Sequence, residues 1–266
     1  MELIQVEVSR TAVESLKTIL RDKFGVNEQI ECVYRVSGGG INDDGHRVAQ
    51  TPSGRRFGIK TKNRGSPDAA RRAAAFSDAC RILGLEEGCR AVCVDSVPGL
   101  DGFETQCAVT EWLPASKQAG EVSAEEKKEL EARLESVAHT LGRWVAANLL
   151  LGLADRGGLK NWVWSQAQFR LVAIDAESAF GGATVQDHHS IIDAFHGRLK
   201  LKAEKGASPA AIAFENGLKE IHAAFRAQKD AIVQLISSIP SISAYVSQYA
   251  QLSEDGFVHR VFSELG

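Results

Sequence analysis

The pattern of apolar and polar positions in the first part of the chain predicts one helix followed by three strands. Apolar residues recur at helical spacing from Val13 to Phe24, and Gly25 ends this run. The segment Thr11–Glu14 has the form of a capping box, which predicts that the helix starts there. Alternating patterns then predict strands over residues 29–36, 46–50 and 55–62, the last two joined by a turn at 51–54.

A second helix and two further strands follow in the same part of the chain. Ser66, Pro67 and Asp68 supply a cap, a proline at the first helical position and an acid in the first turn. The helix is expected to stop near Gly84. Two apolar runs around a turn region rich in proline and glycine then predict strands over residues 91–94 and 107–113.

The rest of the chain is predicted to be mostly helical, with one short hairpin. Ser123 and Glu126 form a capping box, and one long helix is expected from there to about residue 151. Short buried strands are predicted over residues 162–164 and 171–174, with a hairpin connection at 165–168. Further helices are predicted over residues 187–202, 209–237, 242–252 and 257–265.

These elements predict an α+β fold with two lobes. A small N-terminal lobe with an antiparallel sheet is expected over residues 1–113, and a mostly helical C-terminal lobe over residues 114–266. A chain of 266 residues is long enough for one large domain or for two such lobes. Its 44% hydrophobic and 24% charged residues are typical of a soluble globular protein.

Charge and cysteine content exclude several other classes of protein. A net charge of -3 gives no electrostatic reason to expect binding to nucleic acid or to an anionic membrane. The most apolar stretch, residues 145–154, is too short to span a bilayer, and the N-terminus lacks the features of a secretory signal. The five cysteines are odd in number and lack paired metal-ligand spacing, which indicates reduced thiols and a cytoplasmic location.

Three oxygen-bearing side chains stand out around the predicted hairpin. Asp155 and Asn161 lie on the loop before its first strand, and Asp175 directly follows its second strand. A hairpin brings these positions to one edge, so the three side chains are expected to converge. Carboxylate and amide oxygens suit Mg²⁺, which keeps phosphate oxygens in its coordination shell. The alternative is a hairpin with ordinary surface acids.

A glycine run and a lysine stand out in the N-terminal part. Gly38, Gly39 and Gly40 lie between two predicted strands, where their backbone can approach phosphate closely and donate N–H groups to it. Lys60 lies on the strand after the next turn and is the candidate phosphate-binding residue. Lys62, two positions later, is the alternative candidate for this role. A flexible hairpin tip is the alternative interpretation of the glycines. The order of strand, glycine loop, strand, turn and lysine-bearing strand is the nucleotide-covering arrangement of kinases.

The segments from Asp155 to Val163 and from Ala173 to Phe180 resemble the catalytic and metal-binding loops of type II phosphatidylinositol 4-kinases. More broadly they resemble the phosphoinositide-kinase-like branch of the protein-kinase fold (the phosphatidylinositol 3/4-kinase-like proteins), which includes bacterial toxin and effector kinases. The resemblance implies a bilobal kinase-like fold that binds ATP and Mg²⁺. An effector of this kind would be delivered into a host cytosol.

The resemblance also implies a role for each candidate residue. Asp155 orients or deprotonates the acceptor hydroxyl, Asn161 and Asp175 hold Mg²⁺, Lys60 neutralises phosphate charge, and the glycine loop covers the triphosphate. Backbone groups of Glu111, Trp112 and Leu113 contact adenine at the hinge between the lobes. The chain departs from the family in two places. One extra residue separates Asp155 from Asn161, and no acid occurs near Arg72 or Ala73 to pair with the lysine, although Asp68 or Asp78 could serve.

These features leave several functions open. A protein Ser/Thr acceptor is the first choice, because no Lys or Arg occurs between Asp175 and Arg198 to receive an anionic inositol phosphate. A phosphoinositide or a small-molecule acceptor is second. The missing helix acid points either to an activating partner that completes the site or to a non-catalytic nucleotide-binding module. A different nucleotide pose would transfer AMP instead of a phosphoryl group.

Overall fold

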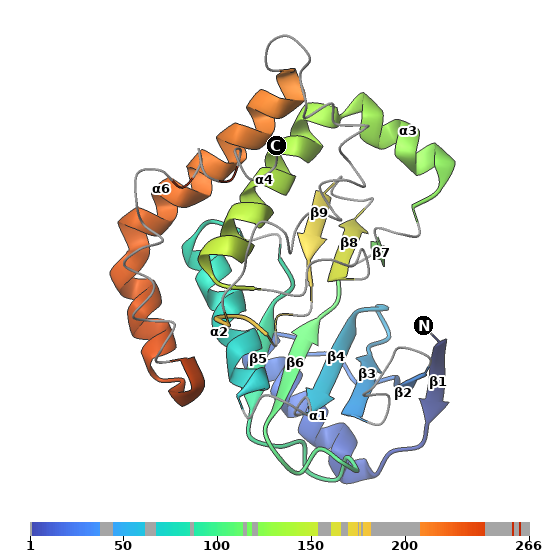
Figure 1. The fold of residues 1–266 in the computed structure, drawn as a ribbon. Coiled ribbons are helices and arrows are strands. Elements are labelled where there is room, and N and C mark those ends of the chain that lie inside the picture. Colours follow the sequence, from blue (N-terminus) through green and yellow to red (C-terminus); the bar gives the residue numbers. More distant parts are fainter. Residues whose placement is uncertain are drawn as a thin grey trace. The chain divides into compact units, whose positions relative to one another are not determined.

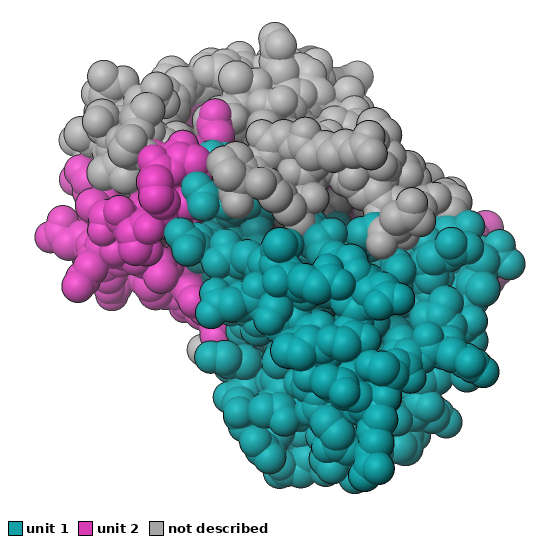
Figure 2. All heavy atoms as spheres, turned by 90° about the horizontal axis from the view of Figure 1, so that it is seen from below, with its two compact units in different colours: residues 1–77, 89–114 teal, residues 78–88, 115–266 magenta. Residues whose placement is uncertain are grey.

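The computed structural model describes residues 2–37, 45–61, 68–85, 88–113, 116–118, 122–153, 161–165, 170–174, 176, 178–181, 208–242, 257 and 261 (Figure 1). The chain forms two compact units. Unit 1 comprises residues 1–77 and 89–114, and unit 2 comprises residues 78–88 and 115–266 (Figure 2). Each unit has its own sheet and is described by itself.

Unit 1 is built on one six-stranded sheet whose neighbouring strands are all antiparallel. The order of strands across the sheet is β1-β2-β3-β4-β6-β5. Their bounds are Glu2–Val6 for β1, Cys32–Ser37 for β2, His46–Gln50 for β3, Arg56–Thr61 for β4, Ala91–Val94 for β5 and Cys107–Glu111 for β6. Strands β2 to β6 lie where the alternating pattern predicts them, within a few residues at their ends. Strand β1 was not predicted.

Helix α1, Arg10–Phe24, covers one face of this sheet. Its buried residues pack in one cluster with Phe57 and Ile59 of β4 and with Val109 of β6. The helix ends at Gly25 as predicted, with a left-handed φ of 69°. The predicted capping box at Thr11 is wrong: the cap is Ser9, whose side chain accepts a hydrogen bond from the N–H of Ala12. Ser9 and Thr11 both carry a hydroxyl group that can cap a helix, and only the backbone conformation shows which of the two does so.

Helix α2, Ala69–Ile82, packs against the opposite face of the sheet. Ala70 and Ala73 contact Ala108 of β6, and all three are buried. The helix ends near Gly84 as predicted, and Gly84 has a φ of 80°. The predicted cap at Ser66 and Pro67 lies outside the described residues.

Unit 2 begins with the capping box that the sequence predicts. The N–H of Ser123 donates to Oε2 of Glu126 at 2.7 Å, and the N–H of Glu126 donates to Oγ of Ser123 at 3.2 Å. The single long helix predicted after it is wrong. Two helices occur, α3 over Ala124–Ala132 and α4 over Leu134–Leu150, because Arg133 between them has φ -122° and ψ 31°. These angles lie outside the helical region and interrupt the hydrogen-bond ladder.

Helices α4 and α6 cross closely in unit 2, and α6 spans Pro209–Ser237 as predicted. A Cβ added to Gly142 would lie 2.1 Å from the carbonyl oxygen of Phe214, and one added to Gly217 would lie 2.2 Å from that of His139. The two glycines therefore let the helix backbones touch. Arg143 donates to the carbonyl of Gly84 at 2.7 Å, and so ties the segment after α2 to α4.

Unit 2 also contains a three-stranded sheet with the strand order β7-β8-β9. Strands β8, Trp162–Ser165, and β9, Arg170–Ala173, pair in antiparallel fashion as predicted, and β7, Ser116–Gln118, adds a strand that was not predicted. The hairpin connection after Ser165 and the helix at 187–202 lie outside the described residues. A short 3-10 helix spans Pro240–Ile242. Of the last predicted helices, the structure describes only Ile242, Phe257 and Val261, and all three are buried.

The fold class follows from these two units. Unit 1 is an α+β unit with an antiparallel sheet, and the described part of unit 2 is mostly helical. None of the described helices combines the length and the apolar character needed to cross a bilayer. None of the five cysteines, all of which are described, forms a disulfide.

Candidate active site

The structure describes some of the predicted site residues and not others. Lys60, Asn161 and the three hinge residues Glu111, Trp112 and Leu113 are described. The remaining predicted residues, Gly38, Gly39, Gly40, Lys62, Asp155 and Asp175, lie outside the described residues. The described residues include the segments at which the predicted loops begin and end.

The loop bearing Asp155 starts at a well-defined helix end. The N–H of Gly152 donates to the carbonyl of Leu149 at 3.3 Å, and the N–H of Leu153 donates to that of Asn148 at 2.7 Å. Gly152 has a left-handed φ of 60° between them. This pair of bonds around a left-handed glycine is a Schellman motif that ends α4 at Leu150, and its last residue, Leu153, lies two positions before Asp155.

The segment that follows Asp175 runs beside this helix end. The N–H of Phe180 donates to the carbonyl of Leu151 at 2.8 Å, and the N–H of Gly181 donates to that of Gly152 at 3.1 Å. Two segments from distant parts of unit 2 therefore share two consecutive backbone hydrogen bonds. We call residues 151–153 together with residues 178–181 the loop junction.

Asn161 lies where the Asp155 loop enters strand β8. Its carbonyl accepts a hydrogen bond of 3.0 Å from the N–H of Ile174, the residue before Asp175. The pairing continues the register in which Trp162 lies opposite Ala173. The Asn161 residue is only 5% exposed. An amide oxygen at this position is a hard donor of the kind that Mg²⁺ accepts.

Phe180 has a backbone conformation that is rare for a bulky residue. Its φ is 60°, and its side chain is 2% exposed. A left-handed conformation is strained for any residue with a large side chain, and such strain concentrates at functional sites. The sequence shows Phe180 only as part of the family resemblance. Glycine and asparagine can indicate a left-handed backbone in a sequence, but a phenylalanine gives no such indication.

Lys60 lies on the face of the unit 1 sheet that is opposite α1. Its partners across the neighbouring strands are His46 on β3 and Ala108 on β6, and Cys93 on β5 follows next to Ala108. Directly paired residues point to the same face of a sheet. Lys60 therefore lies in one row with Ala108, against which α2 packs. Burial raises the pKa of the Cys93 thiol in this row.

The helix position beside this row carries no acid. Ala73 packs on Ala108, so an alanine occupies the place where the kinase resemblance calls for a carboxylate. Asp68 lies 3.9 Å from Nη1 of Arg71, and Asp78 lies 3.4 Å from Nη2 of Arg81. Burial lowers the pKa of the Arg72 guanidinium, and the nearby Asp68 partly opposes this shift. Both candidate acids thus have arginine neighbours on α2 itself.

The hinge residues use part of their backbone within the sheet. The N–H of Glu111 donates to the carbonyl of Arg90 at 2.9 Å, and the N–H of Trp112 donates to that of Arg56 at 2.8 Å. The Glu111 carboxylate accepts from Nε of Arg55 at 3.0 Å. The backbone of Leu113 is also engaged, because it forms a hydrogen bond with the thiol of Cys89.

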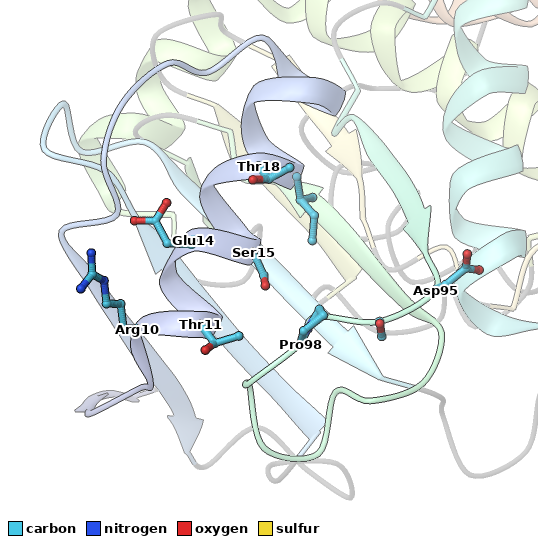
Figure 3. A pocket seen from close by; sticks show the side chains of 9 residues that line it. Arg10, Thr11, Glu14, Ser15, Thr18, Asp95 and Pro98 are labelled. Atoms are coloured by element: carbon cyan, nitrogen blue, oxygen red, sulfur yellow. The ribbon is translucent and has the colours of Figure 1, made fainter.

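A shallow hollow on unit 1 contains none of the predicted site residues. It lies between α1 and the loop after β5, and Figure 3 shows side chains from both elements around it. Hydroxyls of Thr11, Ser15 and Thr18 lie along the helix, and Asp95 and Pro98 belong to the loop. Arg10, Glu14 and Asp95 are the titratable residues that line it.

No family model matches the chain, and no curated protein sequence matches it. Among solved structures, "WaaP in complex with acyl carrier protein" is similar, with 16% identity, 91% of this chain and 100% of that chain covered and a TM-score of 0.41. The FAT and kinase domain of CtTel1 shares 13% identity over 83% of this chain and 20% of its own, with a TM-score of 0.42. The open conformation of CtTel1 has a TM-score of 0.47 at 13% identity, over 99% of this chain and 12% of its own. We take no activity from likenesses this distant.

Proposed function

We propose that the protein transfers the γ-phosphoryl group of ATP to a hydroxyl group, with Mg²⁺ as cofactor. The observation that carries this proposal is the loop junction. The hydrogen bonds from Phe180 to Leu151 and from Gly181 to Gly152 join the segments that flank Asp155 and Asp175. A third bond, from Ile174 to Asn161, ties the remaining metal candidate to the residue before Asp175. Backbone pairing of this kind favours convergence of the three side chains.

Each candidate residue has a distinct role in the proposed reaction. Asp155 accepts the proton of the acceptor hydroxyl or orients that hydroxyl for in-line attack. Lys60 neutralises charge on the phosphates, and the glycines at 38–40 donate backbone N–H groups to them. Positioning and charge neutralisation account for most of the catalysis of phosphoryl transfer, because the transition state spreads negative charge over several oxygens.

The residues of unit 2 fit a magnesium ion. Asn161 and Asp175 would hold it through one amide oxygen and one carboxylate, and Mg²⁺ typically takes one or two protein carboxylates together with substrate phosphates. When bound, the ion would supply neutralisation of the negative charge on the phosphates. Within the described residues, no group of three or more His, Cys, Asp or Glu side chains forms a competing metal site.

A protein serine or threonine is the acceptor that we propose first. The segment after Asp175 carries no Lys or Arg before Arg198. An inositol phosphate headgroup would need cations there, whereas a neutral peptide hydroxyl would not. A lipid or small-molecule hydroxyl is the second choice of acceptor.

One observation favours a second function, nucleotide binding without catalysis. Ala73 faces the row that contains Lys60, so α2 supplies no carboxylate at this position to hold the lysine. In protein kinases the pairing of lysine with a helix glutamate is needed for activity. A chain without this pair either binds nucleotide passively or receives the missing support from an activating partner.

Parallel incubations with labelled nucleotide separate these functions. The full chain with Mg²⁺ is incubated with a cell lysate and either γ-labelled or α-labelled ATP. We expect label from γ-labelled ATP on the chain itself or on a lysate protein, and no label from α-labelled ATP. The Asp175→Ala variant should abolish the labelling, because it removes a proposed metal ligand.

The control variant is Asp95→Ala, which removes an exposed acid on the loop after β5 and should leave labelling unchanged. Label that comes only from α-labelled ATP would show AMP transfer and overturn the proposal. Binding of ATP without any transfer would favour the non-catalytic function.

A further inference from the structure

Asn148 is a fully buried polar side chain at the end of helix α4. The residue is 0% exposed. Neither its amide nitrogen nor its amide oxygen has a hydrogen-bond partner in the described part of the chain. A buried amide without partners destabilises a fold, because the group loses its hydrogen bonds to water and gains none in return.

The position of Asn148 in the helix makes the side chain more unusual. Asn148 supplies the carbonyl that accepts from Leu153, which makes it the third residue from the end of the Schellman motif. This position and the residue two places beyond the helix end commonly share an apolar contact. Leu153 is indeed buried, at 0% exposed, but its counterpart is a polar amide.

The surroundings of Asn148 are otherwise apolar. Every residue from Trp144 to Leu151 is buried. The indole N–H of Trp144, one helical turn before Asn148, also has no partner among the described residues. Residues four apart lie on the same helix face, so Trp144 and Asn148 share one face of α4.

A buried amide without a partner among the described residues and a strained backbone therefore both occur at or beside the loop junction. The unpartnered amide of Asn148 belongs to the helix end that carries the loop junction, and the strained Phe180 belongs to the segment hydrogen-bonded to it. Local choices that oppose stability are expected at functional sites, because elsewhere selection has no reason to retain them.

We propose that Asn148 is a positioning residue of the proposed Mg·ATP site. The protein retains a buried amide at the base of the Asp155 loop, at the expense of stability, because binding of Mg·ATP uses the hydrogen-bonding groups of that amide to hold the loop junction in place. The inference rests on the proposed function and adds to it a residue that carries no charge and contacts no reacting atom.

The test combines two variants with a measurement of thermal unfolding. Asn148→Leu replaces the amide by an apolar side chain, and Asn148→Ala guards against overpacking by the larger leucine. Without nucleotide, we expect the better tolerated variant to melt about 3 °C or more above the wild type, because the unpartnered amide is gone. Mg·ATP and Mg·AMP-PNP should raise the melting temperature of the wild type but not that of the variants.

A titration of Mg²⁺ at fixed nucleotide separates positioning from general stability. The Mg²⁺ concentration that gives half of the melting shift should rise about tenfold or more in the Asn148 variants. The matched control is Thr140→Val, which removes a buried hydroxyl from the same helix two turns earlier. It should leave both the melting shift and its Mg²⁺ dependence unchanged.

The outcomes distinguish the inference from the proposed function. If both Asn148 variants melt below the wild type, the amide is satisfied within the fold and the inference is wrong. A variant that melts higher and keeps the full Mg·ATP shift also overturns it. A wild-type chain that shows no shift with either nucleotide overturns the proposed function itself, and the role of Asn148 with it.

Discussion

The backbone N–H of Phe180 donates a hydrogen bond of 2.8 Å to the carbonyl of Leu151, and this bond joins two loops that carry the chemistry proposed for the chain. Leu151 is the C-cap residue of helix α4 and precedes Asp155 by four positions, and Phe180 follows Asp175 by five. A carbonyl at a helix end needs a partner outside the helix. Here the partner is the N–H of Phe180, so the segment around Phe180 is held at the end of α4.

The first prediction concerns the strain at Phe180. Replacing a buried phenylalanine by alanine costs about 3–5 kcal/mol of unfolding free energy through lost packing. At Phe180, with φ 60°, glycine should cost about 1 kcal/mol less than alanine, because glycine adopts the left-handed conformation without strain. Urea unfolding of Phe180→Gly and Phe180→Ala measures the difference.

The matched pair for this comparison is Phe214→Gly and Phe214→Ala. Phe214 is equally buried but lies within helix α6, where glycine should be worse than alanine by about 1 kcal/mol. The order of the two substitutions should therefore reverse between the two sites. The same order at both positions would contradict a left-handed backbone at Phe180.

The second prediction concerns the crossing of α4 and α6. Gly217→Ala places a methyl group where it meets the carbonyl of His139, and the helices must move apart to accept it. Overpacking of this kind should cost about 2–3 kcal/mol of unfolding free energy. The control, Gln228→Ala, changes an exposed position further along α6 and should stay within about 0.5 kcal/mol of the wild type. A Gly217→Ala chain of unchanged stability would show that the helices do not touch there.

The third prediction concerns the start of α1. Ser9→Ala removes the side chain that accepts from Ala12 and should lower the unfolding free energy by about 1 kcal/mol. Thr11→Ala removes the hydroxyl that the sequence pattern favoured as the cap. Because Thr11 is exposed and does not cap the helix, its loss should be nearly neutral. Chemical denaturation of the two variants measures both changes in unfolding free energy. An equal loss of unfolding free energy in both variants would count against Ser9 as the cap.

The fourth prediction concerns the pH dependence of stability. Burial raises the pKa of the Cys107 thiol to about 12, above its ordinary value in an unfolded chain of about 8.5. The neutral thiol is therefore favoured by folding. Burial of the neutral thiol contributes its full share of the unfolding free energy below about pH 8.5. This share is lost as the pH rises toward 12, by at most about 1.4 kcal/mol per pH unit.

The measurement compares unfolding free energies at about pH 8 and pH 10.5 for the wild type and for Cys107→Ala. The variant should lose less stability between the two pH values, because it lacks the buried thiol. Cys32→Ala, which changes a half-buried cysteine on β2, serves as the reference for a cysteine outside the core. Equal pH dependence in the wild type and in Cys107→Ala would contradict the assignment.

Local patterns predicted many elements correctly, for identifiable reasons. Strands β3 and β5 and helix α6 have the bounds that their apolar spacing predicts. Gly25 and Gly84 end helices because they adopt the left-handed conformation that a helix end requires. The capping box of Ser123 and Glu126 was visible because both its members lie within four residues. Each of these signals is short-range.

The two strands that were not predicted have a common physical cause. Strand β1 is exposed along much of its length and forms because β2 offers it an edge to pair with. Strand β7 likewise forms through pairing with β8, from a different part of the chain. Arg133 has a non-helical backbone conformation, although the sequence around it favours a helix. Partners remote in sequence decided both strands, whereas the break at Arg133 has no structural explanation.

The sequence by itself determined the order of the elements, where most helices end, and which polar residues are candidates for chemistry, because these depend on side chains within a few positions of one another. Only the tertiary structure decided that the end of α4 and the segment around Phe180 are hydrogen-bonded, and that Lys60 shares a face with α2 and not with α1. It also decided that the Asn148 side chain is buried with no hydrogen-bond partner among the described residues. Each of these facts depends on which segments, distant in sequence, pack against each other. That packing is determined by how the whole unit buries its apolar surface, and no local sequence pattern encodes it.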